Sequence, residues 1–117
     1  MNIPVLQIER FLIVSVQGEL KDNDVTALQQ NLLERLRRTE AAGVLIDLTA
    51  VEVVDSYMGR LLRDTAAMIR LMGVPTVVVG LRPAVAVTLV ELGLDLPGIH
   101  TDLNLERGLT WLRTQMR

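Results

Sequence analysis

Two short apolar runs, at residues 44–48 (VLIDL) and 74–80 (VPTVVVG), constrain the fold of this chain more than any other feature. Neither run alternates between apolar and polar residues, and only Asp47 places a charge in the first one. Strands with this near-continuous apolar character are typical of parallel sheets, because helices cover both faces of such sheets. The two runs therefore predict central, buried, parallel strands.

Segments with helical spacing surround these runs. Residues 21–43 are expected to form the first helix, with Asp22 or Asp24 as its N-cap and Gly43 as its end. The apolar stripe of this helix recurs every three or four residues, at Val25, Leu28, Leu32 and Leu36. Residues 57–72 are expected to form the second helix. Its predicted apolar face comprises Met58, Leu61, Leu62, Thr65, Ile69 and Met72.

Two further helices are expected after the second apolar run. Pro83 suits the first turn of a helix over 83–92, because its missing N–H needs no partner there, and Gly93 closes that helix. The last helix has an apolar stripe made of Leu105, Leu109, Leu112 and Met116. Trp111, on this last helix, is expected to pack rather than to bind a ligand.

Three shorter β-rich segments complete the pattern. Residues 3–8 and 11–17 predict an antiparallel pair at the start of the chain, and residues 98–101 predict a final short strand. Strands that alternate with helices in this way indicate an α/β domain with a mostly parallel sheet and right-handed crossovers. The length of 117 residues suits a single domain.

The composition argues against several classes of function. With a net charge of −2 the chain lacks the broad basic field that nucleic-acid binding needs. No apolar run approaches the ~18 residues of a membrane-spanning helix. The chain has no cysteine and neither of the two common glycine-rich phosphate loops, and its single histidine, His100, cannot form a metal or nucleophilic site alone. We therefore expect a cytoplasmic protein that uses no cofactor or metal and is not an enzyme.

Asp47 is one candidate phosphoryl acceptor, because it lies near the end of a buried strand in an α/β domain. That chemistry needs further carboxylates to hold Mg²⁺ and a lysine near the phosphoryl group. The only lysine is Lys21, before the first expected helix, and Glu52 and Asp55 lie beyond the strand. The sequence therefore offers this interpretation little support.

The dipeptide Asp55-Ser56 precedes the second expected helix and allows two interpretations. Both residue types are favoured N-caps, so a structural role is the simpler interpretation. A capping box built on Ser56 would place Glu or Gln three residues later, where the chain has Gly59 instead. Backbone N–H groups at a helix start can also bind a phosphate, which makes Ser56 a candidate phosphorylation site. The two roles are compatible.

The residues around this serine predict a surface for a partner protein. Tyr57 and Met58 are expected to present large apolar groups at the exposed start of the helix. Gly59 costs up to ~1 kcal/mol in a helix relative to alanine, which suggests the close approach of another backbone or of a partner. The predicted partner-binding residues are Asp55, Tyr57, Met58, Gly59 and Arg60.

The segments LIDLTAVEVVDSYMGRLL and LMGVPTVVVGLRPAVAVTLVELGLDL, in this order of elements, resemble the STAS domain family. That family comprises the bacterial antagonists of anti-sigma factors and their relatives. The Asp-Ser pair together with GLRPAVAVTLVELG at residues 80–93 resembles in particular the stressosome branch, with its RsbS-type scaffold. The resemblance covers nearly the whole chain, with no sensory domain expected before it. It implies a single STAS domain over residues 1–117, with a mixed, mostly parallel sheet, an N-terminal antiparallel pair and about four flanking helices.

Two hydroxyl residues are singled out by this resemblance. Ser56 matches by position the serine that the family phosphorylates, and Asp55 matches the acid before it. The general antagonists usually follow this serine with a small residue and glycine, whereas Tyr57 and Met58 follow it here, which favours the stressosome branch. Thr88 resembles a position where sensor paralogues can carry a second phosphorylatable threonine. A hydroxyl that bonds back along its own helix is the simpler interpretation of Thr88.

The resemblance implies a partner switch rather than a catalyst. The unmodified protein would hold a serine/threonine switch kinase within a large complex that also contains STAS-bearing sensor paralogues. Phosphorylation of Ser56 by that kinase would release it towards a downstream partner, and a phosphatase would reset the system. The high aliphatic content also predicts a homo-oligomer, because a small domain cannot easily bury so much apolar surface internally.

Two alternatives stay open on the sequence. Within the same fold, the chain could be a stand-alone anti-sigma factor antagonist that binds an anti-sigma kinase. Such a protein would stay small when mixed with paralogues, whereas a scaffold would enter a very large particle. In another class, the chain could be a nucleotide- or metabolite-binding STAS domain, which saturable nucleotide binding would reveal.

Overall fold

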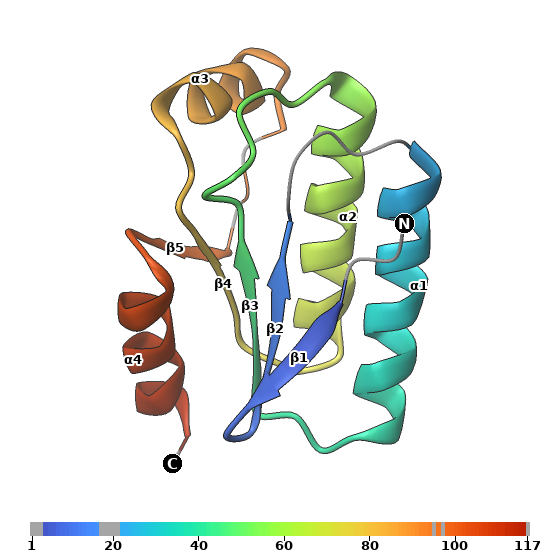
Figure 1. Cartoon of the computed structure of the whole chain (residues 1–117), viewed down its shortest axis with the longest axis vertical. Coiled ribbons are helices and arrows are strands. Elements are labelled where there is room, and N and C mark those ends of the chain that lie inside the picture. Colours follow the sequence, from blue (N-terminus) through green and yellow to red (C-terminus); the bar gives the residue numbers. More distant parts are fainter. Residues whose placement is uncertain (1–3, 17–21, 95, 97, 117) are drawn as a thin grey trace.

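A computed structural model describes residues 4–16, 22–94, 96 and 98–116, which form a five-stranded sheet and four helices (Figure 1). The elements in chain order are β1 (Val5–Ile8), β2 (Phe11–Ser15), α1 (Asp22–Arg38), β3 (Gly43–Asp47), α2 (Ser56–Leu71), β4 (Thr76–Val79), α3 (Pro83–Glu91), β5 (His100–Asp102) and α4 (Leu105–Gln115). The strands are ordered β1-β2-β3-β4-β5, with β1 and β2 antiparallel and the others parallel. The predicted mixed α/β fold is confirmed.

The two apolar runs form the centre of the sheet, as predicted. β3 pairs with β4 in parallel, with Ile46 opposite Val78. Ile46 and Val78 face the core beneath α1 and α2, whereas Leu45 and Val77 face the core beneath α4. Helices on both faces leave few positions for polar residues in these strands, which explains their continuous apolar character.

The first helix ends earlier than its pattern predicts. α1 ends at Arg38, and the amide and hydroxyl of Thr39 both donate to the Arg35 carbonyl, at 3.0 and 2.7 Å. Gly43 is not the end of this helix but the buried first residue of β3, where a Cβ would lie 2.7 Å from Leu112 Cδ2. Its small size therefore serves packing between β3 and α4.

Of the two residues predicted as N-cap of the first helix, Asp24 is not the cap. The helix begins at Asp22, so Asp24 lies inside its first turn and is not the N-cap. Lys21, which precedes the helix, lies outside the described residues, as does the side chain of Asp22.

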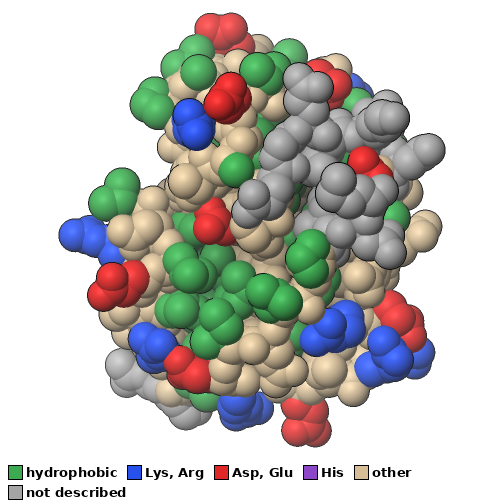
Figure 2. Space-filling view, in the orientation of Figure 1, with side chains coloured by type: hydrophobic (Ala, Val, Ile, Leu, Met, Phe, Trp, Pro, Cys, Tyr) green, Lys and Arg blue, Asp and Glu red, His purple; other side chains and the backbone are tan. Residues whose placement is uncertain are grey.

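One face of the sheet is covered incompletely. α4 packs on β3, β4 and β5, and it leaves Leu6 and Ile8 of β1 exposed on the same face. Figure 2 shows hydrophobic side chains at the surface between α4 and β1. Across the described part of the chain, no helix combines the length and apolar character needed to cross a membrane.

The turn between β1 and β2 is tied to α4 by an ion pair. Glu9 has a φ of 56°, in the left-handed region that residues other than glycine seldom adopt. Arg113 Nη2 donates to Glu9 Oε2 at 2.6 Å, and Arg113 Nε lies 3.2 Å from both carboxylate oxygens. These hydrogen bonds lower the pKa of the Glu9 carboxyl below its ordinary value.

Glu9→Gln is expected to lower the free energy of unfolding at neutral pH, and this loss is expected to disappear in acid. Because Arg113 lowers the folded-state pKa of Glu9, the ionised carboxylate stabilises the fold at every pH above the unfolded-state pKa of this carboxyl. That stabilisation is lost as the pH falls through the lowered folded-state pKa, where Glu9 is protonated and resembles glutamine. Urea unfolding of both proteins across this pH range measures the difference. A loss of equal size in neutral and acidic solution would contradict the assignment.

Candidate functional site

The loop between β3 and α2 is held firmly at the carboxyl ends of the parallel strands. Val51 and Val54 are buried and anchor the loop in the core. Asp47 Oδ1 accepts hydrogen bonds from the amide and hydroxyl of Thr49, at 2.9 and 2.6 Å. Arg82 Nε donates to the Thr49 carbonyl at 2.9 Å and links this loop to the start of α3. These contacts therefore fix the position of the loop that leads into α2.

Asp55, not Ser56, is the N-cap of α2. Asp55 has extended backbone angles, and its Oδ1 accepts a hydrogen bond from the Met58 amide at 2.8 Å. Ser56 is the first residue of the helix and is exposed. Its hydroxyl makes no hydrogen bond with any residue that the structure describes. The cap and the candidate phosphorylation site are thus two neighbouring residues with separate roles.

Met58 and Gly59 lie in the core rather than on the surface. Met58 is 8% exposed, so the expectation that it presents an apolar group to solvent is wrong. A Cβ on Gly59 would lie 2.9 Å from Leu94 Cδ1 and 3.1 Å from Leu89 Cδ2. The close approach that this glycine allows is made by α3 and the residues just after it, not by a second protein.

Tyr57 and Arg60 are exposed near Ser56, in agreement with their predicted place on the surface. Tyr57 is 44% exposed, and its hydroxyl lies 3.1 Å from Thr26 Oγ1 of α1, so its ring is fixed against the neighbouring helix. Sequence reasoning missed Thr26, because no local pattern relates two residues 31 positions apart. It also missed Val53, which is 82% exposed just before the cap.

Thr88 and Asp47, the two other candidates for modification, have internal partners. The Thr88 hydroxyl donates to the Ala84 carbonyl one turn earlier in α3, at 3.0 Å, as in the simpler interpretation. The Asp47 carboxylate binds Thr49 within its own loop. No cluster of three potential metal ligands occurs among the described residues. Asp47 therefore lacks neighbouring carboxylates that would hold Mg²⁺ for phosphoryl transfer among the described residues, and a second phosphorylation at Thr88 stays a prediction.

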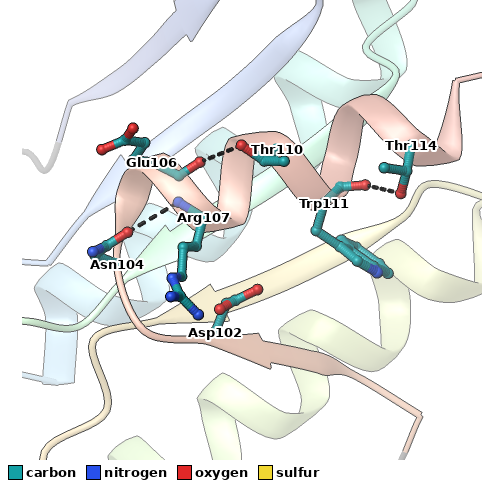
Figure 3. A pocket seen from close by; sticks show the side chains of 7 residues that line it. All are labelled: Asp102, Asn104, Glu106, Arg107, Thr110, Trp111 and Thr114. Atoms are coloured by element: carbon teal, nitrogen blue, oxygen red, sulfur yellow. Dashed lines mark hydrogen bonds between the residues drawn. The ribbon is translucent and has the colours of Figure 1, made fainter.

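A shallow cavity of about 530 Å³ lies beside α4, and no residue of α2 lines it (Figure 3). Next to it, the rings of His100 and Trp111 stack with centroids 4.2 Å apart, so the predicted packing role of Trp111 is confirmed. The Leu103 amide and His100 both bond the Asp102 carboxylate and lower its pKa. The lining residues are Asp102, Asn104, Glu106, Arg107, Thr110, Trp111 and Thr114. This mixture of charges does not single out a ligand class.

Asp55→Ala is expected to lower the free energy of unfolding by about 1 kcal/mol, and Asp55→Asn by much less. Alanine removes the acceptor of the Met58 amide, whereas asparagine keeps an oxygen in the same place. Urea unfolding of the three proteins measures the effect. Asn104→Ala removes the same kind of cap from α4 and serves as the matched control, with a similar expected loss. If Asp55→Ala were as stable as wild type, the carboxylate would not act as a cap.

Comparisons with known proteins identify the family to which this fold belongs. A model of the STAS domain matches residues 2–107. The chain is 31% identical over 107 residues to the RsbT co-antagonist protein RsbRA of Bacillus subtilis, a match that covers 92% of this chain and 38% of the relative. The chain therefore spans well under half of that relative's length.

Two solved structures are similar over almost their full length. A serine-to-glutamate variant of Moorella thermoacetica RsbS superposes with a TM-score of 0.88 at 38% identity, covering 96% of this chain and 95% of that one. A structure of the stressosome, described as a signal integration and transduction hub, contains a chain with a TM-score of 0.87 at 38% identity, covering 97% of this chain and 99% of that one. The chain belongs to the STAS domain family, in which it is similar to the stressosome protein RsbS.

Proposed function

We propose that this protein is a non-catalytic scaffold in a partner-switching stress response, and that it binds a serine/threonine switch kinase which phosphorylates Ser56. The main support for this proposal is the exposure and the hydrogen bonding of the Ser56 side chain. Its hydroxyl is exposed and has no hydrogen-bond partner among the described residues, while Asp55 supplies the cap of α2. A kinase can therefore modify Ser56 without removing a contact that the fold needs.

The start of α2 can tolerate a phosphate but does not neutralise it. The first amides of a helix point towards an anion at this position, and Arg60 lies one turn further along the same helix. The Asp55 carboxylate is adjacent and opposes the added charge. Each of these effects is on the order of 1 kcal/mol, so we expect phosphorylation to change the surface far more than the fold.

The surface around Ser56 suits a protein partner. Val53 and Tyr57 expose apolar groups on either side of the serine in sequence, and Arg60 adds a cation. Tyrosine and arginine are enriched at the energetically important positions of interfaces. In place of the five predicted partner-binding residues, we propose that Val53, Asp55, Tyr57 and Arg60 contact the kinase, because Met58 and Gly59 are buried.

The proposed assembly rests on the relatives. RsbRA is named a co-antagonist of RsbT, and the stressosome is a multi-protein particle that contains a chain of this fold. We propose that this protein likewise assembles with longer STAS-bearing sensor paralogues in the cytoplasm, and that a phosphatase resets Ser56. A stand-alone antagonist would not enter such a particle.

Phosphorylation of Ser56 can be tested with the switch kinase, ATP and the purified protein. Intact-mass measurement and peptide mapping are expected to find one phosphate on Ser56 in the wild type and none there in Ser56→Ala. Thr88→Ala is the control and is expected to be phosphorylated like the wild type. Phosphate on another residue, with Ser56 unmodified, would refute the assignment.

A further inference from the structure

A groove runs between the C-terminal half of α2 and the segment that leads into β5. It has a volume of about 730 Å³, which is enough for several side chains. Its apolar lining consists of Ala67, Leu71, Leu96 and Ile99, and Leu71 is 88% exposed. Exposed apolar surface in a concave site indicates a contact with another molecule.

Two arginines, Arg63 and Arg70, and one acidic residue, Asp64, line this groove. Arg63 Nη2 lies 3.6 Å from Asp64 Oδ1, so part of its charge is balanced. Arg70 forms no ion pair within the part of the chain that the structure describes. Its guanidinium lies close to Gly98, where a Cβ would be 2.6 Å from Arg70 Cζ. The groove therefore has an apolar lining and, in Arg70, a cation that can form an ion pair with a carboxylate of another molecule.

The outer face of α3 is also apolar, but its charged residue is acidic. α3 is apolar nearly all round, with Glu91 as its one charged residue. Helices of this kind are normally buried, yet Val87 is 55% exposed and Val90 is 68% exposed. Leu92, directly after the helix, is 43% exposed. Figure 2 shows hydrophobic side chains gathered at the top of the view, where α3 lies.

These two surfaces complement each other, and we propose that α3 of one copy of the chain docks in the α2 groove of a second copy. Val87, Val90 and Glu91 are three and four residues apart, so they lie on one side of α3. The valines would cover Leu71 and Ile99. Glu91 would pair with Arg70.

The proposed contact joins two different surfaces, so it is heterologous. Each copy that uses its α3 still has a free groove, and the assembly grows beyond a dimer until it closes into a ring or extends as a filament. This contact deepens the proposed scaffold function, because it supplies a way for the chain to build a large particle. It does not involve Ser56.

Charge exchange between the two surfaces tests the contact, with light scattering of the purified chain at tens of micromolar. The wild type is expected to form species larger than a dimer. Arg70→Glu and Glu91→Arg are each expected to weaken this association by about tenfold or more, because like charges then meet. An equimolar mixture of the two variants is expected to restore the large species, since opposite charges meet again at every contact.

Two matched controls carry the same charge changes on α4. Arg107→Glu and Glu106→Arg both alter exposed residues and are expected to associate like the wild type. Thermal melts check that all four variants are folded. A monomeric wild type, a single variant that keeps its full association, or a mixture that stays dissociated would each overturn the proposal. No kinase is present, so these outcomes are independent of the proposed role of Ser56.

Discussion

Ser56→Asp is expected to weaken the binding of the switch kinase by about tenfold or more, whereas Ser56→Ala is expected to bind as tightly as the wild type. Ser56 lies between exposed Val53 and Tyr57, in the middle of the proposed contact. A carboxylate placed there without a partner has to lose its water when the kinase binds, and burying an unpaired charge costs several kcal/mol. Each ~1.4 kcal/mol corresponds to a factor of ten in affinity.

Neither substitution should disturb the fold, because Asp55 provides the cap and the Ser56 hydroxyl has no partner among the described residues. Thermal melts of both variants are expected to stay within a few degrees of the wild type. Calorimetric titration with the kinase measures the affinities. Thr110→Asp, which adds the same charge at an exposed hydroxyl of α4, is the control and should bind normally. Wild-type affinity of Ser56→Asp would contradict the proposed contact.

Gly108→Val is expected to lower the free energy of unfolding by about 2–3 kcal/mol. Gly108 is the point where α4 lies against the sheet, and a Cβ there would be 2.7 Å from both Leu45 Cδ1 and Val79 Cγ1. Leu45 and Val79 both belong to the buried core beneath α4. The introduced valine at position 108 is β-branched, so it has few rotamers with which to avoid them. α4 would have to shift away from the sheet, and that movement exposes apolar surface.

Urea unfolding of Gly108→Val measures this effect. Thr110→Val places the same β-branched side chain at an exposed position of the same helix and controls for helix propensity. We expect the control to change stability by less than about 0.5 kcal/mol. Equal effects of the two substitutions would show that α4 does not need a glycine to pack on the sheet.

The parts of the fold that could be predicted are those with local signals. The central strands were predictable because burial on both faces makes them apolar throughout, and α2 was predictable because its stripe recurs at helical spacing. Gly43 was misassigned for a physical reason: a glycine after a helical pattern is equally consistent with a helix end and with a tightly packed strand. Contact with Leu112, far along the chain, decides between them.

In the candidate site, too, the features with local sequence signals were predicted correctly, and those that depend on contacts between distant residues were not. An Asp-Ser pair before a helix predicts a cap, but only the backbone angles and the bond to Met58 assign that role to Asp55. Sequence reasoning placed Met58 at the surface, and for Gly59 it left open whether another backbone or a partner comes close, because it could not foresee that α3 packs over this end of α2. Tyr57 keeps its predicted exposure.

The affinity of the switch kinase for two forms of the protein tests the central claim most directly. One form is unmodified, and the other is phosphorylated stoichiometrically on Ser56, with phosphatase-treated protein as the control for reversibility. A phosphate adds about −1.5 to −2 charges at pH 7, more than aspartate, so its desolvation in the contact costs more. The account predicts that phosphorylation weakens binding by about a hundredfold or more and that the phosphatase restores it. Equal affinity of the kinase for the two forms would contradict the partner switch.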